Sequence, residues 1–150
     1  MRTHPTRSWS RPIAALALAL AAAIGISACS SAATATSSQS PATGQHLDAT
    51  AFSAALKTPG TIVLDVRTPA EFATGPLPQA RNIDIEAPDF ATRMAALDKT
   101  ATYAIYCRSG NRSGAAMEQM AGADFTHVYD LAGGIGAWQN MGGPMSMTGP

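Results

Sequence analysis

A short segment in the last third of the chain combines a cysteine, two arginines and a glycine. It reads Cys107-Arg108-Ser109-Gly110-Asn111-Arg112-Ser113. Gly110 permits a tight turn, and Asn111 tolerates unusual backbone angles. Successive backbone N–H groups can then converge on one point and bind an anion. The segment therefore predicts a loop that holds the sulfur of Cys107 among hydrogen-bond donors.

The charges around this loop predict a reactive thiol. The positive end of a helix that begins near Arg112 favours an anion, and Arg108 and Arg112 add two full charges. We therefore expect the pKa of Cys107 to lie below its usual value of about 8.5, so that the nucleophilic thiolate forms readily. The alternative is a buried structural cysteine at the end of a strand, but such a residue needs neither arginines nor a glycine turn.

The elements that position this loop can be predicted from hydrophobic patterns. Nearly continuous apolar runs indicate buried strands, and amphipathic segments with caps indicate helices. The expected strands are Thr61–Val66, Ala80–Ile85, Thr102–Tyr106 and Thr126–Tyr129. One helix is expected to begin after Asp48, which serves as its N-cap. Further helices are expected over Thr68–Ala73, Pro88–Leu97 and Arg112–Ala121, and in a short segment that carries Trp138. The tail from Met141 is expected to be loose.

Strands that alternate with helices predict a mostly parallel sheet. In such sheets, ligands bind at the carboxyl ends of the strands. Cys107 directly follows the predicted strand Thr102–Tyr106, and Asp65 ends a neighbouring strand. We therefore expect Asp65 to face the same pocket as Cys107 or to form a hydrogen bond across it.

The N-terminus resembles a bacterial lipoprotein signal. Three arginines precede a run of 14 apolar or small residues, Ile13–Ile26, which is shorter than the roughly 20 residues of a transmembrane helix and typical of a secretory signal peptide. Ile26-Ser27-Ala28-Cys29 resembles a lipobox, whose cysteine is acylated and becomes the first mature residue. We therefore expect a signal peptide over residues 1–28, lipidation of Cys29, and anchoring in the bacterial cell envelope on the periplasmic or extracellular side. A plain signal peptide or an uncleaved anchor is the alternative.

Composition divides and bounds the rest of the chain. Residues 29–45 contain no charge and no large apolar side chain, which predicts a flexible tether, so the folded domain is expected over residues 46–150. The ten basic and ten acidic residues balance, which argues against a nucleic-acid partner. Two cysteines exclude a disulfide-dense scaffold.

Five ordered motifs in residues 46–150 resemble a single rhodanese domain. They are Leu64-Asp65-Val66-Arg67, Pro69-x-Glu71-Phe72, Gly75-x-Leu77-Pro78-x-Ala80-x-Asn82-Ile83, the Cys107 loop, and Leu131-x-Gly133-Gly134-x-x-Ala137-Trp138. The resemblance implies an α/β fold with a mainly parallel five-stranded sheet and helices on both faces. It also implies sulfur transfer without a cofactor or a metal: thiosulfate or a persulfide donor loads Cys107, and a thiophilic acceptor such as cyanide, a thiol or sulfite removes the sulfur.

The resemblance also implies roles for the individual residues. The backbone N–H groups from Arg108 through Ser109, Gly110 and Asn111 to Arg112 would stabilise the persulfide. Arg108 would attract the anionic donor at the mouth, and Arg112 would open the helix and can pair with an acid. Arg67 lies four residues before Glu71, so we expect an ion pair between them, with contact to substrate as the alternative.

Two other functions compete with a sulfurtransferase. Related phosphatases and arsenate reductases use a Cys-x5-Arg loop, whereas this chain has the shorter Cys-x4-Arg spacing. The second alternative is a non-catalytic module of the same family that only carries sulfur to another protein or docks with it. The intact Cys107 loop favours the enzyme, since a pure docking module would not need that nucleophile. Pro76 stands where family members often have a histidine, which we expect to affect the choice of acceptor more than activity. His46 and His127 fall in strand-like segments, far from Cys107 in sequence, and predict no Ser/His/Asp or metal site.

Overall fold

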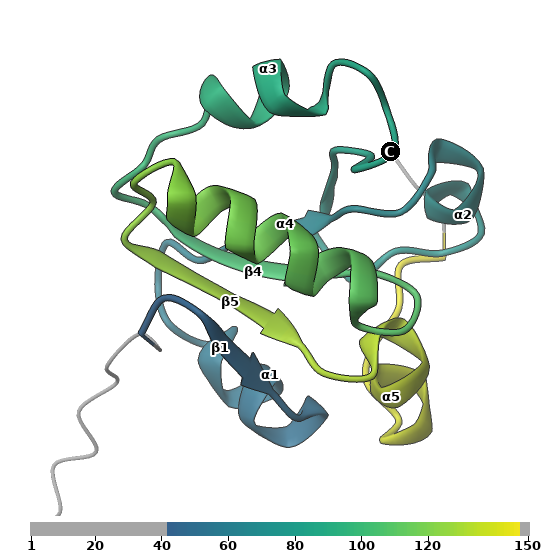
Figure 1. Cartoon of the computed structure of the whole chain (residues 1–150). Coiled ribbons are helices and arrows are strands. Elements are labelled where there is room, and N and C mark those ends of the chain that lie inside the picture. The colour runs from purple at the N-terminus through teal and green to yellow at the C-terminus, as the bar shows by residue number, and fades with distance from the viewer. Residues whose placement is uncertain (1–41, 148–150) are drawn as a thin grey trace, which may run out of the picture. The chain divides into compact units, whose positions relative to one another are not determined.

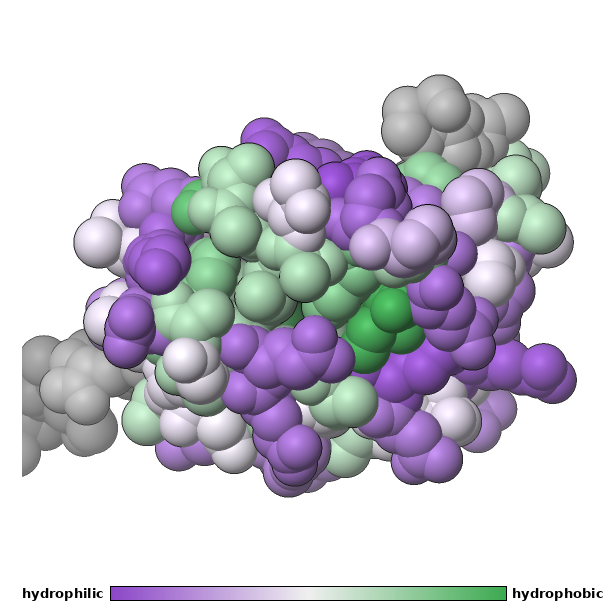
Figure 2. Space-filling view, turned by 45° about the horizontal axis from the view of Figure 1, so that its top comes forward, coloured by the Kyte–Doolittle hydropathy of each residue, from purple (hydrophilic) through white to green (hydrophobic). Residues whose placement is uncertain are grey.

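A computed structural model describes residues 42–147 of the chain. The predicted signal peptide, the lipidation site at Cys29 and most of the predicted tether lie outside the described residues. Within the described range, no helix combines the length and the apolar character that crossing a bilayer requires. The large apolar side chains that are exposed in this range are Met141 and Met147. Figure 2 shows one face of the domain, on which hydrophilic residues surround a central group of apolar ones.

The centre of the fold is a five-stranded sheet (Figure 1). Its strands are β1 (Gln45–Leu47), β2 (Ile62–Asp65), β3 (Arg81–Asn82), β4 (Thr102–Tyr106) and β5 (His127–Leu131). They lie in the order β1-β5-β4-β2-β3, and all four pairings are parallel. The predicted fold class is confirmed, and His46 and His127 do lie in strands.

Helices cover both faces of this sheet. They are α1 (Ala49–Ala55), α2 (Pro69–Ala73), α3 (Phe90–Ala95), α4 (Asn111–Gly122) and α5 (Gly134–Asn140). One apolar cluster packs α3 and α4 on one face of the sheet, and a second cluster packs α1, α2 and α5 on the other. Because the sheet is covered on both sides, its central strands are apolar in nearly every position.

Local capping explains where the first two helices begin. The side chain of Asp48 accepts a hydrogen bond from the N–H of Ala51 at 2.8 Å and caps α1, as predicted. Thr68 and Glu71 form a reciprocal capping box at the start of α2, with Pro69 in the first turn. Both caps satisfy backbone donors that lack a partner within the helix.

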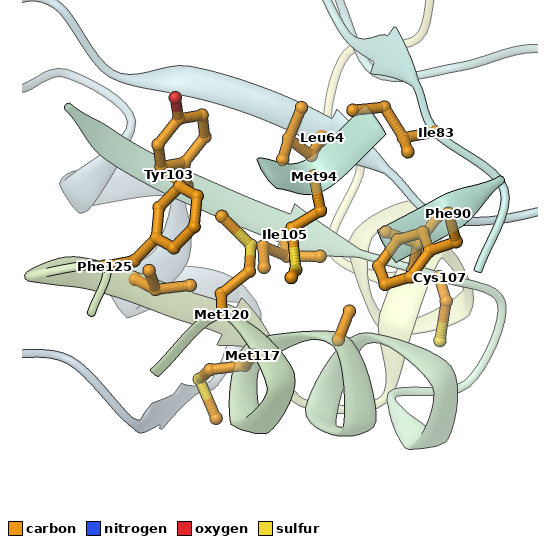
Figure 3. Close-up of a cluster of buried hydrophobic side chains, with 13 residues drawn as sticks. Leu64, Ile83, Phe90, Met94, Tyr103, Ile105, Cys107, Met117, Met120 and Phe125 are labelled. Atoms are coloured by element: carbon orange, nitrogen blue, oxygen red, sulfur yellow. The ribbon is translucent and has the colours of Figure 1, made fainter. Parts of the chain in front are cut away.

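The alternation of side chains along β4 places the cysteine. Tyr103, Ile105 and Cys107 pack in the cluster beneath α3 and α4, whereas Ala104 and Tyr106 pack in the cluster on the opposite face. This alternation is the ordinary period of a strand. Figure 3 shows Cys107 beyond the end of β4, beside Phe90, with its sulfur directed toward α4. The end of β4 therefore places Cys107 beside the first turn of α4.

The segment after α5 is held in place, so the prediction of a loose tail from Met141 is wrong for the part that is described. The indole N–H of Trp138 donates to the carbonyl of Pro144 at 2.9 Å, and the N–H of Ser146 donates to the carbonyl of Pro76 at 2.8 Å. A Cβ on Gly143 would come within 2.3 Å of the Trp138 ring. Glycine at that position lets the chain fold back over the indole.

Candidate active site

The loop after β4 turns at a single left-handed residue. Gly110 has φ +99°, and a Cβ there would lie 3.1 Å from the backbone nitrogen of Gly133. Asn111 is the first residue of α4 and has no positive φ, so the unusual backbone angle that we allowed for Asn111 is not observed. Glycine is therefore required at position 110 both for its conformation and for the close approach of another segment.

The sulfur of Cys107 lies among hydrogen-bond donors. The thiol is free and fully buried, and the N–H of Gly110 donates to Sγ at 3.1 Å. Burial alone would raise the pKa of the Cys107 thiol. Hydrogen bonds from the Ser113 hydroxyl and from the backbone N–H groups of Ser113, Ser109 and Gly110 outweigh burial and lower this pKa below its ordinary value. The predicted thiolate-stabilising loop thus forms, with Ser113 as a donor that the sequence analysis did not assign.

The N-terminus of α5 packs against the backbone of the Cys107 loop. The N–H of Ile135 donates to the carbonyl of Cys107 at 2.8 Å. Gly134 has φ +60°, and a Cβ there would lie 2.5 Å from the carbonyl carbon of Arg108 and 2.6 Å from the carbonyl oxygen of Cys107. The Gly133-Gly134 pair therefore lets two backbone segments touch, which fixes the path of the loop.

Arg112 forms an ion pair across the site. Its two terminal nitrogens donate to the two carboxylate oxygens of Glu71, each at 2.8 Å, and a longer contact of 3.4 Å reaches Glu86. The Arg112 hydrogen bonds lower the pKa of Glu71 to about 2. The same contact raises the pKa of Arg112. The predicted pairing of Arg112 with an acid is confirmed, and it ties α4 to α2.

The expected pair between Arg67 and Glu71 is wrong, because each has another partner. Arg67 binds Asp65 through three side-chain contacts of 2.6 to 3.0 Å, and its guanidinium lies 5.5 Å from the centre of the Tyr106 ring. Asp65 is fully buried and Arg67 nearly so. Asp65 therefore does not face the pocket. It neutralises Arg67, since a buried charge needs a partner.

A hollow of about 380 Å³ lies on the side of the loop toward α2 and α5. Arg67, Glu71, Arg108, Ile135 and Gln139 are among the residues that line it, and we call it the Arg108 hollow. The guanidiniums of Arg67 and Arg112 are held by carboxylates, whereas the side chain of Arg108 is exposed. Arg108 is thus placed, as expected, where an anion could approach it.

A second hollow of about 420 Å³ lies on the other side of the loop. Its lining includes Ser109, Gly110, Asn111, His46 and Asp130, and we call it the His46 hollow. The structure therefore separates the predicted loop residues: Arg108 faces one hollow, and Ser109 to Asn111 face the other.

Three polar residues beside the His46 hollow form a hydrogen-bonded series that we did not predict from the sequence. The Ser113 hydroxyl donates to Oδ2 of Asp130 at 2.8 Å, and Nδ1 of His46 lies 2.7 Å from Oδ1 of the same carboxylate. His46 is thus close to the site in space, although it is far from Cys107 in sequence. The available signal was Asp130 itself, a charged residue in the otherwise apolar end of a strand beside β4. Across residues 42–147, no group of three or more His, Cys, Asp or Glu side chains is arranged to hold a metal ion.

Comparisons with known proteins agree with this geometry. The sequence model of the rhodanese-like domain matches residues 48–141. The chain belongs to the rhodanese-like family. A sulfurtransferase of Allochromatium vinosum is 35% identical to it over 100 residues, which cover 66% of this chain and 92% of that protein. The thiosulfate sulfurtransferase GlpE of Ectopseudomonas mendocina is 35% identical over 85 residues, which cover 56% of this chain and 75% of that protein.

Solved rhodanese structures share the fold. A rhodanese-related protein from Thermoplasma volcanium superimposes with a TM-score of 0.62 at 30% identity, covering 69% of this chain and 98% of that one. The rhodanese-like domain of the Anabaena protein Alr3790 gives a TM-score of 0.60 at 29% identity, covering 67% and 77%. In this rhodanese-like domain, Pro76 is buried and its carbonyl accepts a hydrogen bond from the N–H of Ser146, which holds the C-terminal segment.

Proposed function

We propose that this protein is a sulfurtransferase that carries a sulfane sulfur on Cys107. The observation that carries the proposal is the N–H of Gly110, which donates to Sγ of Cys107 at 3.1 Å at the carboxyl end of β4. Burial opposes the thiolate, and the donors of the loop outweigh burial and lower the pKa of Cys107. The thiolate is the nucleophilic form of cysteine, and a lowered pKa makes more of it available. The names of the sulfurtransferase relatives support the same chemistry.

The proposed reaction has two steps, and each step ends with the negative charge on a stable anion. The Cys107 thiolate attacks the outer sulfur of thiosulfate, the S–S bond of thiosulfate breaks, and sulfite leaves with the electron pair. The resulting Cys107 persulfide is held by the N–H groups of the loop. An acceptor such as cyanide or a thiol then attacks the outer sulfur of the persulfide, takes it as thiocyanate or as a new persulfide, and releases the Cys107 thiolate.

Arg108 gives the proposed site its preference for an anionic donor. Its guanidinium is exposed on the Arg108 hollow, and the neighbouring Arg67 and Arg112 are neutralised by Asp65 and Glu71. An exposed charge raises the local concentration of an oppositely charged substrate. Thiosulfate and organic persulfides both carry negative charge, so Arg108 serves either donor.

The position of Arg112 favours sulfur transfer over phosphate chemistry. A phosphatase loop needs its arginine to clamp a tetrahedral phosphate with two parallel hydrogen bonds. Here both terminal nitrogens of Arg112 bind Glu71. The guanidinium of Arg112 is therefore not free to clamp a phosphate. The short Cys-x4-Arg spacing also makes the Cys107 loop small, which suits one additional sulfur atom.

Turnover in solution tests the proposal. Purified protein is incubated with thiosulfate and cyanide, and thiocyanate is measured. We expect the Cys107→Ser variant to be inactive and the Cys29→Ser variant, which removes the chain's other cysteine, to retain activity. If neither thiosulfate nor a persulfide donor yields product with the folded protein, the proposed activity is wrong, and a docking role becomes the better account.

We also propose that the protein is lipid-anchored at Cys29 and faces outward from the bacterial cytoplasm. The support is the basic start, the apolar run Ile13–Ile26 and the sequence Ile26-Ser27-Ala28-Cys29. In a bacterial host, a detergent that separates into two phases tests this anchor. The lipidated protein is expected in the detergent phase and the Cys29→Ala variant in the aqueous phase. Equal partition of the two would contradict lipidation.

A further inference from the structure

The hydroxyl of Ser113 has one proton and three acceptors within reach. Ser113 is fully buried. Its hydroxyl lies 3.0 Å from the carbonyl of Gly110 and 2.8 Å from Oδ2 of Asp130. The third acceptor is the sulfur of Cys107, which is directed toward α4, the helix whose first turn contains Ser113 (Figure 3). Burial raises the pKa of this thiol, and the Ser113 side chain is the first of the hydrogen-bond donors that lower it. A hydroxyl donates only one hydrogen bond at a time, so a proton given to Asp130 is withheld from the sulfur.

Asp130 has a second donor that makes this exchange feasible. Its side chain is fully buried, and Oδ1 lies 2.7 Å from Nδ1 of His46, whose side chain is 60% exposed. A carboxylate oxygen accepts hydrogen bonds, so this contact fits the form of His46 that has an N–H at Nδ1. A buried carboxylate needs hydrogen bonds in place of its lost hydration. His46 supplies one that persists when Ser113 turns away.

The first turn of α4 lies beside His46 and Asp130. Gly114 lies in the first turn of the helix, although glycine is a poor helix former. A Cβ at Gly114 would meet Cε1 of His46 at 3.4 Å and Oδ2 of Asp130 at 3.9 Å. The imidazole of His46 therefore lies against the start of α4, at ordinary van der Waals distance from this position. His46 also lines the same hollow as Ser109 and Gly110, so it lies on the same side of the Cys107 loop as these two residues.

We propose that Asp130 and His46 are positioning residues for Cys107: Asp130 competes with the sulfur for the proton of Ser113, and His46 weakens this competition by holding Asp130. While the sulfur is a thiol, Ser113 donates to Asp130. When the sulfur carries negative charge, as a thiolate or a persulfide, the hydroxyl turns to it and His46 alone compensates the carboxylate. This inference rests on the proposed function, for which it supplies the control of the nucleophile.

The pKa of the Cys107 thiol is the direct readout. We measure it from the ultraviolet absorbance of the thiolate in the full-length protein with Cys29→Ala, so that Cys107 is the remaining thiol. Removing the donor in His46→Ala should raise this pKa by about half a unit to one unit. The variant His46→Gln keeps an N–H donor and should restore most of the shift. Asp130→Asn removes the competing charge and should lower the pKa.

A double-mutant cycle shows whether the effect passes through Ser113. Ser113→Ala should itself raise the pKa, and adding His46→Ala should then cause no further shift. An unchanged pKa in His46→Ala, a rise in Asp130→Asn, or an equal shift in the Ser113→Ala background would each overturn the proposal. The measurement uses the resting protein without a sulfur donor. Failure of sulfur transfer alone, with the pKa pattern intact, would therefore contradict the proposed function and not this inference.

Discussion

Arg112 and Glu71, 41 residues apart in sequence, form a two-point ion pair that joins the first turn of α4 to α2. Glu71 also closes the capping box of α2 with Thr68. The Glu71 carboxylate thus connects α2, which borders the Arg108 hollow, to α4, which follows the Cys107 loop. The pair therefore holds these two helices together at the site.

This pair predicts a defined pH dependence of stability. Because Arg112 lowers the pKa of Glu71 from 4.5 to about 2, the carboxylate stabilises the folded state above pH 4.5, and this contribution is lost as the pH falls toward 2. We expect Glu71→Gln to lower the free energy of unfolding by about 1 kcal/mol at neutral pH, a value reduced for solvent screening. Urea denaturation of both proteins from pH 7 to pH 2 should show the difference vanish. Glu86→Gln, whose contact with Arg112 is longer and more exposed, is the control and should have a smaller effect.

The glycine pair at the start of α5 predicts a second effect, on both stability and activity. In Gly134→Ala, the new Cβ would collide with the backbone of Arg108 and Cys107, so the loop must shift. We expect a loss of more than about 2 kcal/mol of stability together with loss of sulfur transfer. Gly142→Ala is a matched control, because Gly142 also has a positive φ, of +77°, but nothing lies within 4 Å of its Cβ. That variant should lose only about 1 kcal/mol, through backbone strain, and keep its activity. Thermal unfolding measures the stability of the two variants, and the thiocyanate assay measures their activity. Equal losses in Gly134→Ala and Gly142→Ala would contradict a role for the close contact between Gly134 and the Cys107 loop.

The buried pair of Asp65 and Arg67 predicts a large loss of stability. In Arg67→Met, the carboxylate of Asp65 would remain buried without its cation, and we expect a loss of about 3 to 5 kcal/mol. Arg81→Met changes an exposed arginine on β3 and should lose less than about 0.5 kcal/mol. Chemical denaturation of the two variants tests this difference. Near-equal stabilities would show that Arg67 is not needed to neutralise Asp65.

The exposed guanidinium of Arg108 predicts a kinetic effect without a structural one. In Arg108→Gln, we expect KM for thiosulfate to rise by about twofold to fivefold, since an exposed charge contributes less than about 1 kcal/mol. The value of kcat should change little, and added salt should reduce the difference between variant and parent. An unchanged KM at low salt would remove Arg108 from donor binding.

Much of the fold could be predicted because its signals are local. The strand Thr102–Tyr106 was predicted with its observed bounds, and the helix predicted over Thr68–Ala73 is observed over Pro69–Ala73. A β-branched and aromatic run and a capping proline each act within a few residues. The strand predicted over Ala80–Ile85 is shorter in the structure, at Arg81–Asn82, although the N–H groups of Ile83 and Ile85 still donate to the carbonyls of Asp65 and Val66.

The parts of the site that could not be predicted depend on contacts between distant segments. A spacing of four residues suggested an ion pair between Arg67 and Glu71, but Asp65 lies nearer to Arg67 within the fold, and α4 brings Arg112 to Glu71. The approach of His46 to Asp130 requires β1 to pair with β5, which local sequence does not specify. The cysteine loop itself was predictable, because the sulfur, the turn and the start of the helix are contiguous.

The most direct test of the central claim is the intact mass of the protein after incubation with thiosulfate. The account predicts a gain of one sulfur atom in the parent protein, loss of that sulfur on addition of cyanide, and no gain in Cys107→Ser. The same gain in Cys107→Ser, or none in a folded parent protein exposed to thiosulfate and to a persulfide donor, would contradict a sulfur carrier at Cys107.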